Sequence, residues 1–124
     1  MANVGKTQLL ILISCPAEEA EEGKRIFGTH GPWMAATHHQ EGNKALLSYE
    51  VSWTDEISNP MDTSSEPTGR TLFVLNEIYE TPDGVQDHME QADASWDDFP
   101  AFGAWLEKCT VSGTAAAPIM NSLW

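Results

Sequence analysis

Three apolar segments along the chain predict β-strands. Residues 7–14 are rich in β-favouring side chains and carry no charge, so they predict a strand that is buried on both faces. Residues 47–53 alternate apolar and polar side chains with a period of two, which predicts a strand with one apolar face. Residues 71–79 are again apolar on both parities, except at Asn76 and Glu77, and they predict a third strand.

The segment after the first of these strands carries helix signals. Residues 16–27 begin with a proline and place four glutamates ahead of Lys24 and Arg25, the order that the helix dipole favours. Two glycines and Pro32 then predict the end of this helix near residue 27. Because proline is favoured at the first position of a helix, Pro32 predicts a second, short helix that runs to His38 or the residue after it.

The rest of the chain predicts a loop, two further helical segments and a last strand. Residues 58–69 are polar and contain two prolines, so we expect an exposed hairpin loop. Thr81 and Pro82 repeat the helix-start chemistry, and Pro100 separates this helix from a last helical stretch. The expected apolar stripe of the helix comprises Val85, His88, Met89 and Ala92. A short segment after Cys109 predicts a fourth strand.

The order of these elements is βαββαβ, in one domain that spans residues 1–124. We expect an α+β, ferredoxin-like fold, with the first and third strands at the centre of an antiparallel sheet and the helices on one face. A lone sheet of this kind exposes its other face, yet both central strands are apolar on both parities. The simplest cover is the same sheet of a second copy, so we expect a homodimer.

Acidic side chains dominate the composition. The 124 residues include 6 Lys and Arg against 19 Asp and Glu, a formal net charge of −13. Such a chain repels phosphate backbones and anionic lipid surfaces, which argues against nucleic-acid and membrane partners. Most of the acids fall on helix exteriors and in the long loop, where charge favours solubility. Glu77, in an apolar strand, is the acid that this explanation does not cover.

Two cysteines, Cys15 and Cys109, make no disulfide framework, so we expect reduced thiols and a cytoplasmic location. Antiparallel pairing of the first and last strands would bring the thiols together, which leaves a redox pair as the alternative. Residues 12–15 also have the composition of a lipoprotein cleavage box. The apolar run of five residues before the cysteine is short of the roughly 7 to 15 that a signal peptide needs, so we expect no export.

The segment from residue 75 to residue 88, LNEIYETPDGVQDH, resembles a known signature. It carries Glu77 and Tyr79 on a strand and His88 on the next helix. This pattern is similar to the strand-to-helix motif of the dimeric α+β barrel superfamily, nearest its antibiotic biosynthesis monooxygenase-like group. The resemblance implies cofactor-independent oxygenation of aromatic molecules, haem degradation, or isomerase and lyase chemistry. The haem-degrading branch is the least similar, because its haem-ligating histidine lies further along the second helix.

His88 is the first candidate catalytic residue. It shares the apolar stripe of its helix, and a neutral imidazole there could take a proton from a phenol or an enol. The alternative is a buried histidine whose ring nitrogens are both satisfied by neighbours. Asn76 and Glu77 point to opposite faces of their strand. Asn76 could bind a substrate carbonyl and a desolvated Glu77 would have a raised pKa, or each is a structural polar group.

Flat aromatic side chains offer apolar area for a substrate, although any core of this size uses them. The expected substrate-binding residues are Tyr49, Tyr79, Trp33 and Trp96. The adjacent pair His38 and His39 points about a quarter-turn apart on a helix and chelates one ion poorly. We therefore expect neither a metal nor another cofactor.

These residues predict a cofactor-independent enzyme, of the monooxygenase type that the resemblance implies, acting on a small aromatic or enolisable molecule between the sheet and the helices. His88 would be its base, with Asn76 and Tyr79 orienting the substrate. The alternative is a non-catalytic protein of the same fold that binds a small molecule or responds to stress. An open pocket beside His88 would favour the enzyme, and a closed interior would argue against both.

Overall fold

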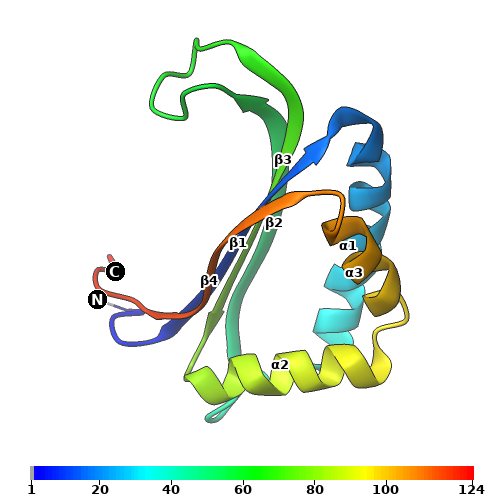
Figure 1. The fold of residues 1–124 in the computed structure, drawn as a ribbon. Helices are drawn as coiled ribbons and strands as arrows, with labels where there is room; N and C mark the ends of the chain where they lie inside the picture. Colours follow the sequence, from blue (N-terminus) through cyan, green and yellow to red (C-terminus); the bar gives the residue numbers. More distant parts are fainter. Residues whose placement is uncertain (1) are drawn as a thin grey trace.

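A computed structural model describes residues 2–124 of the chain. The elements are β1 (Thr7–Pro16), the 3₁₀ helix η1 (Ala17–Glu19), α1 (Ala20–Thr37), β2 (Leu46–Ile57), β3 (Pro67–Tyr79), α2 (Pro82–Ser95), α3 (Phe99–Leu106) and β4 (Thr110–Pro118). The strands form one antiparallel sheet in the order β2-β3-β1-β4, and the helices lie on one of its faces (Figure 1). The fold is therefore α+β and compatible with a ferredoxin-like arrangement, with more helices than the simple βαββαβ order contains.

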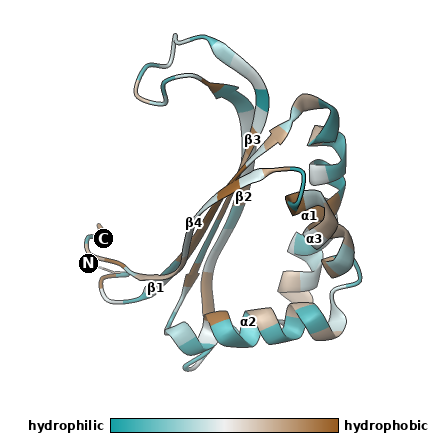
Figure 2. Ribbon diagram, viewed as in Figure 1, coloured by the Kyte–Doolittle hydropathy of each residue, from teal (hydrophilic) through white to brown (hydrophobic). Residues whose placement is uncertain are grey.

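The two central strands, β1 and β3, divide the sheet into a covered and an open face. Leu9 and Ile13 of β1, and Phe73 and Leu75 of β3, are at most 4% exposed beneath the helices. The side chains that alternate with these along each strand, such as Leu12, are half-buried and point to the open face. Figure 2 shows that the middle of the sheet is largely hydrophobic, as the sequence predicts for strands that are apolar on both parities.

β2 is the expected strand, but the first of its side chains that faces the core is Leu46 and not Leu47, where the predicted alternation begins. Its pairing with β3 shifts between Leu46 and Ser48, so one extra residue is inserted there. This bulge lets Leu46 pack against the core and leaves Leu47 41% exposed. Tyr49 and Val51 pack against the core as expected.

α1 is one helix, so the predicted break near residue 27 is wrong. Pro32 lies inside it. A proline within a helix removes one hydrogen bond and crowds the carbonyl four residues earlier. That carbonyl belongs to Gly28. The helix also buries Ile26, His30 and Met34 on one stripe, at most 3% exposed, and this tertiary packing outweighs the local signal.

α2 begins as the sequence predicts. The Thr81 hydroxyl accepts a hydrogen bond from the Asp83 backbone N–H, and the proline occupies one of the first helical positions. Met89 is 44% exposed, however, so it is not part of the buried stripe.

The last strand is also confirmed: Gly113 of β4 has φ +133°, and a Cβ there would collide with the carbonyl oxygen of Leu10 in β1.

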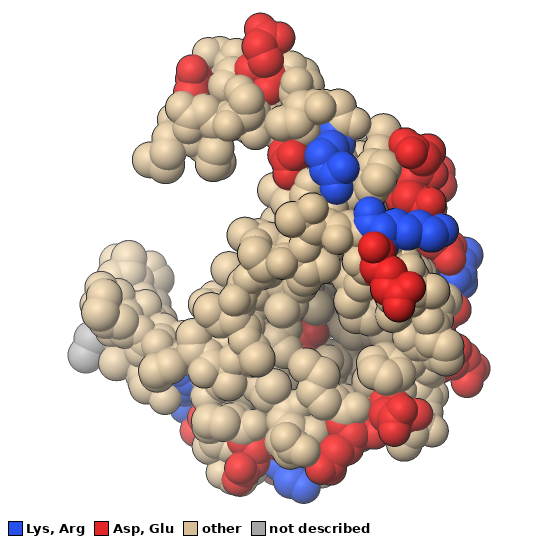
Figure 3. Space-filling model, viewed as in Figure 1, with Lys and Arg blue, Asp and Glu red and all other residues tan. Residues whose placement is uncertain are grey.

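The open face is concave. The β2–β3 hairpin and the segment after β4 both curve away from the helices, toward the same side (Figure 1). Figure 3 shows acidic residues along the helices and on the hairpin, where the sequence predicts a charged exterior.

Across residues 2–124, no helix has both the length and the hydropathy of a membrane span. Cys15 is buried, Cys109 is half-buried, and both thiols are free.

Candidate functional site

The helix-facing side of β3 brings a carboxylate into the core. Glu77 is 0% exposed, and it is the only acidic residue among residues 2–124 that is buried. The hydroxyl of Tyr79, two residues along the same face, donates a hydrogen bond to Glu77 Oε1 at 2.5 Å. Among residues 2–124, Glu77 Oε2 has no hydrogen-bond partner. A buried carboxylate oxygen without a partner is costly, which marks this position as one that stability alone does not explain.

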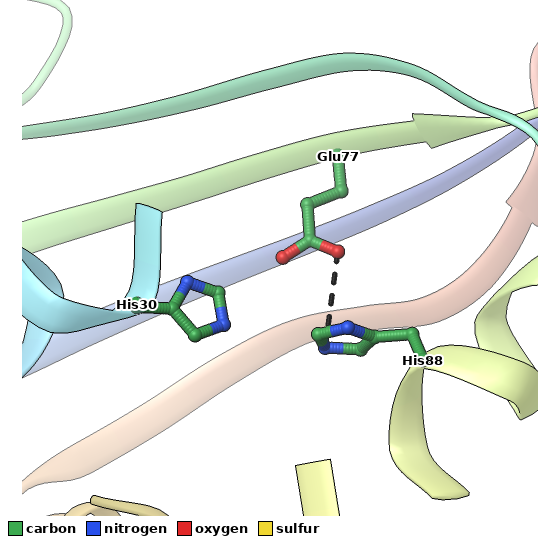
Figure 4. Close-up of side chains that lie close together, drawn as sticks. All are labelled: His30, Glu77 and His88. Atoms are coloured by element: carbon green, nitrogen blue, oxygen red, sulfur yellow. Dashed lines mark ion pairs between the residues drawn. The ribbon is translucent and has the colours of Figure 1, made fainter. Parts of the chain in front are cut away.

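Two buried imidazoles face this carboxylate (Figure 4). His30 comes from α1 and His88 from α2, and their exposed fractions are 3% and 5%. His88 Nε2 lies 3.8 Å from Glu77 Oε1. One nitrogen of each histidine and one carboxylate oxygen all lie within 4.8 Å of one another. We call His30, Glu77 and His88 the Glu77 cluster.

A hydrogen-bond chain fixes the orientation of the His88 ring. The Thr37 hydroxyl donates its one hydrogen to the Trp33 carbonyl at 2.7 Å, so its oxygen accepts from His38 Nδ1, 2.9 Å away. His38 Nε2 then carries a lone pair and accepts from His88 Nδ1 at 2.8 Å. His88 Nε2 is thereby left with a lone pair that faces Glu77.

The other ring of the cluster is also anchored. His30 Nδ1 lies 2.8 Å from the hydroxyl of Tyr49, which reaches it from β2. The Trp96 ring packs edge-on against His30, with 4.7 Å between the ring centroids. Both imidazoles are therefore held at Nδ1 by partners from outside the cluster, a pattern that leaves Nε2 to face inward.

Trp33 of α1 covers the cluster. Its indole centroid lies 5.7 Å from that of His30 and 5.9 Å from that of His88, and its ring stacks on Trp96. The Trp33 Nε1–H donates to Ser95 Oγ at the end of α2. Trp33 is half-buried, whereas the two histidines beneath it are buried, so this side chain separates the cluster from solvent.

Burial sets the protonation of the cluster. It raises the pKa of Glu77 to about 7, and the hydrogen bond from Tyr79 acts in the opposite direction. Burial, with neighbouring histidines, lowers the pKa of His88 to about 3 and that of His30 to about 4. Both imidazoles are therefore neutral near pH 7, while the carboxyl group gains and loses its proton there. Glu77 suits the role of base better than His88, which the sequence favoured.

Most of the sequence-predicted site residues come together here. Six of them surround the same point in the core: His88, Glu77, Tyr49, Tyr79, Trp33 and Trp96. Asn76 does not, because it lies on the open face and accepts a hydrogen bond from Gln8 at 3.0 Å. It therefore cannot orient a substrate that is bound beside His88.

His30 is the site residue that sequence reasoning missed. It stands four residues after Ile26 and four before Met34, which is the spacing of one helix face. That signal is visible only if the helix continues through Pro32. The predicted break between residues 27 and 32 hid it.

Two cavities lie away from the cluster. One of about 690 Å³ is on the open face, beneath the β2–β3 hairpin, and its lining includes Leu12, Leu72 and Thr54. The other, of about 510 Å³, lies against the loop between α1 and β2 and is lined by residues such as Asn43 and Thr81. The interior beside His88 is instead filled by aromatic rings, a closed arrangement that argues against both an enzyme and a ligand-binding protein there unless a covering side chain such as Trp33 moves.

No known protein-family model matches the chain, and no curated protein matches it at a significant level. The geometry of the Glu77 cluster therefore carries the functional argument.

Proposed function

We propose that the protein is an enzyme that takes a proton from a small aromatic or enolisable molecule, held between the sheet and the helices, and so prepares that molecule to react with oxygen. One observation carries the proposal: a buried carboxylate with a free oxygen faces two neutral imidazoles. Desolvation makes such a carboxylate a stronger base than it is in water, and a base whose pKa lies near the working pH is the most effective.

The reaction needs no group beyond the substrate and molecular oxygen. Glu77 Oε2 takes a proton from an acidic C–H of the substrate, and the resulting electron-rich carbanion or enolate donates electrons to O₂. For a methylene carbon, one oxygen atom becomes a new carbonyl and the other leaves as water with the two hydrogens. The methylene carbon is oxidised and O₂ is reduced. Cofactor-free chemistry of this kind is what the sequence resemblance implies.

The neighbouring residues have distinct roles in this proposal. Tyr79 holds Oε1 by its hydrogen bond and so leaves Oε2 for the substrate. His88 offers Nε2 as an acceptor for a substrate hydroxyl. A substrate reaches the cluster by displacing Trp33, because that half-buried side chain is its cover. Trp33 and Trp96 then provide the flat apolar surface that an aromatic ring prefers.

A panel of hydroquinones, polycyclic phenols and 1,3-dicarbonyl compounds tests the proposal in chelator-treated buffer. The readouts are oxygen uptake and exchange of the acidic carbon-bound hydrogen for deuterium. Glu77→Gln keeps the shape of the side chain and should lose at least 100-fold in rate, the scale of general-base catalysis. Glu50→Gln is the matched control, because Glu50 is exposed on the open face, opposite Asn76. A wild-type rate in Glu77→Gln, or no exchange with any compound, would contradict the proposal.

A second candidate function is small-molecule binding without catalysis, and the cavity on the open face favours it. That cavity offers apolar contact from Leu12 and Leu72 and hydroxyl groups from Ser14 and Thr54, but no histidine. Methyl and imidazole NMR signals locate any compound that binds. Shifts at Leu12 and Leu72 would support this second function, and shifts at His30 and His88 would support the enzyme.

We also propose that two copies pair through their open faces. Central positions of that face are apolar at Leu10, Leu12, Leu72, Val74 and Ile78, and polar but uncharged at Gln8, Ser14 and Asn76. Strands β1 and β3 thus carry no acid at these central positions, whereas the edge strand β2 carries Glu50 on this face, and Asp55 and Glu56 line its cavity. Because the centre of this concave face is apolar and uncharged, two acidic molecules can approach there with less repulsion than through their helices, and a second copy is the partner whose surface has the same character.

A further inference from the structure

We infer that His30, Glu77 and His88 form a binding site for one divalent transition-metal ion of the zinc or iron type. This inference does not rest on the proposed function, because metal binding is measured without a substrate. The three residues come from α1, β3 and α2, so the site joins both long helices to the sheet (Figure 4).

The first argument is that lone pairs face one another. The hydrogen-bond chain through Thr37 and His38 gives His88 its hydrogen on Nδ1, so Nε2 is an acceptor. It lies 3.8 Å from Glu77 Oε1, which is an acceptor too, and Glu77 Oε2 has no hydrogen-bond partner within the described part of the chain. Acceptors that face each other in a buried site need a hydrogen or a positive charge between them: a proton on Glu77 supplies the first, and a metal ion between the charged carboxylate and the imidazoles supplies the second.

The second argument is the size of the space. The three candidate ligand atoms lie within 4.8 Å of one another. Two ligands on one tetrahedral zinc ion stand about 3.4 Å apart, since each bond is about 2.1 Å long. The 3.8 Å between His88 Nε2 and Glu77 Oε1 is too long for a hydrogen bond and slightly wider than the metal-bound spacing. Small inward shifts of the side chains therefore complete the site.

The third argument is that every ligand has an outer partner. Histidines that bind metals almost always donate their other ring N–H to a neighbouring group. His30 has Tyr49 at 2.8 Å from Nδ1, and His88 has His38 at 2.8 Å from Nδ1. The carboxylate is held at Oε1 by Tyr79. These contacts orient the three ligands before any ion arrives.

The ligand set defines the kind of ion. Two imidazoles with one carboxylate suit zinc and ferrous iron, whereas magnesium and calcium prefer sites made of oxygen. Three protein ligands leave at least one position open on the ion, for water or for an anionic oxygen such as a phenolate. A metal ion on the Glu77 carboxylate also competes with its proton, so the proton transfer proposed above belongs to the metal-free protein.

Titration of chelator-treated, tag-free protein with Co²⁺ and Zn²⁺ tests the site, by visible absorption for Co²⁺ and by calorimetry for Zn²⁺. Wild type should bind one ion per chain, with the d–d absorption of a cobalt site that has nitrogen and oxygen ligands. His30→Gln, Glu77→Gln and His88→Gln should each weaken binding at least 100-fold, and His38→Gln about 10- to 100-fold. His39→Gln is the control, because His39 is exposed beside Asp87, 3.6 Å away, and should leave binding unchanged.

Failure to bind one ion per chain would overturn the inference, as would binding that His88→Gln keeps and His39→Gln loses. Because the ligand variants remove buried groups, circular dichroism must show that they fold. If these variants do not fold, a measurement of histidine NMR signals on the wild-type protein tests the inference instead. In protein labelled with ¹⁵N-histidine, Zn²⁺ should shift Nε2 of His30 and His88. Shifts confined to other histidines, or none, would overturn the inference without any variant.

Discussion

At the scale of single residues, Glu77 couples the stability of the metal-free protein to pH. Folding raises its pKa from the ordinary 4.5 to about 7. The carboxyl group therefore contributes its full stability below pH 4.5, and that contribution is lost as the pH rises toward 7. A shift of this size corresponds to about 3 kcal/mol. Relative to Glu77→Gln, wild type should lose about this much unfolding free energy across that window, as urea unfolding in chelator would measure. Parallel pH profiles would contradict this assignment.

Tyr79 should stabilise the fold through the same carboxylate. Its hydroxyl is buried and donates to Glu77 Oε1. Tyr79→Phe leaves Oε1 without this donor, so we expect a loss of about 1.5–3 kcal/mol at pH 8, where Glu77 is charged, and a smaller loss at pH 5. Denaturant unfolding at both pH values measures the difference. An equal loss at the two values would mean that the contribution of the hydroxyl does not depend on the charge of Glu77.

At the scale of elements, α1 offers a matched pair of glycines. A Cβ on Gly23 would lie 2.5 Å from Trp105 Cζ2 and 2.8 Å from Phe73 Cζ, whereas nothing lies within 4 Å of one on Gly28. Gly23→Ala should therefore destabilise the protein by about 1–3 kcal/mol through overpacking. Gly28→Ala should stabilise it by about 0.5–1 kcal/mol, because alanine favours a helix interior. Thermal unfolding compares them, and similar effects of both changes would contradict the packing of α1 on the sheet.

How far the sequence predicted the elements depends on the range of the forces involved. The presence of the strands and the start of α2 were predicted correctly, because apolar runs, period-two alternation in residues 47–53 and the Thr81 cap are local signals. The ends were less accurate: β3 begins at Pro67, inside the predicted loop of residues 58–69. The continuation of α1 through Pro32 was not predicted, because it depends on the burial of Ile26 and Met34 against segments that are distant in the sequence. The bulge near Leu46 is likewise a property of the pairing with β3.

The candidate site also contains some residues that local sequence signals predict and others that depend on tertiary packing. Glu77, Tyr79 and His88 were predicted because they fall in one short segment, and their placement around a common point follows from the strand-to-helix turn. His30 and the hydrogen-bond chain through Thr37 and His38 could not be predicted in this way. They reach the site from α1 and from His38, the residue that follows this helix. The side of the sheet that holds the larger cavity depends on how the hairpin curves, which no local pattern in residues 58–69 specifies.

At the scale of the whole molecule, the open face should control association. Val74→Glu places a charge at the centre of that face, so light scattering coupled to size-exclusion chromatography should find one chain per particle instead of two. Met89→Glu is the control: it adds the same charge at an exposed apolar side chain on α2, and the dimer should persist. A monomeric wild type at micromolar concentration would contradict the proposed pairing.

The arrangement of the Glu77 cluster underlies both the proposed enzyme and the proposed metal site. Its most direct test is the tautomer of His88 in the metal-free protein, from long-range ¹⁵N–¹H correlations of labelled histidine. The hydrogen-bond chain from Thr37 through His38 predicts a neutral ring at pH 7 with its hydrogen on Nδ1 and a lone pair on Nε2 toward Glu77. A hydrogen on Nε2, or a charged ring at pH 7, would contradict this arrangement.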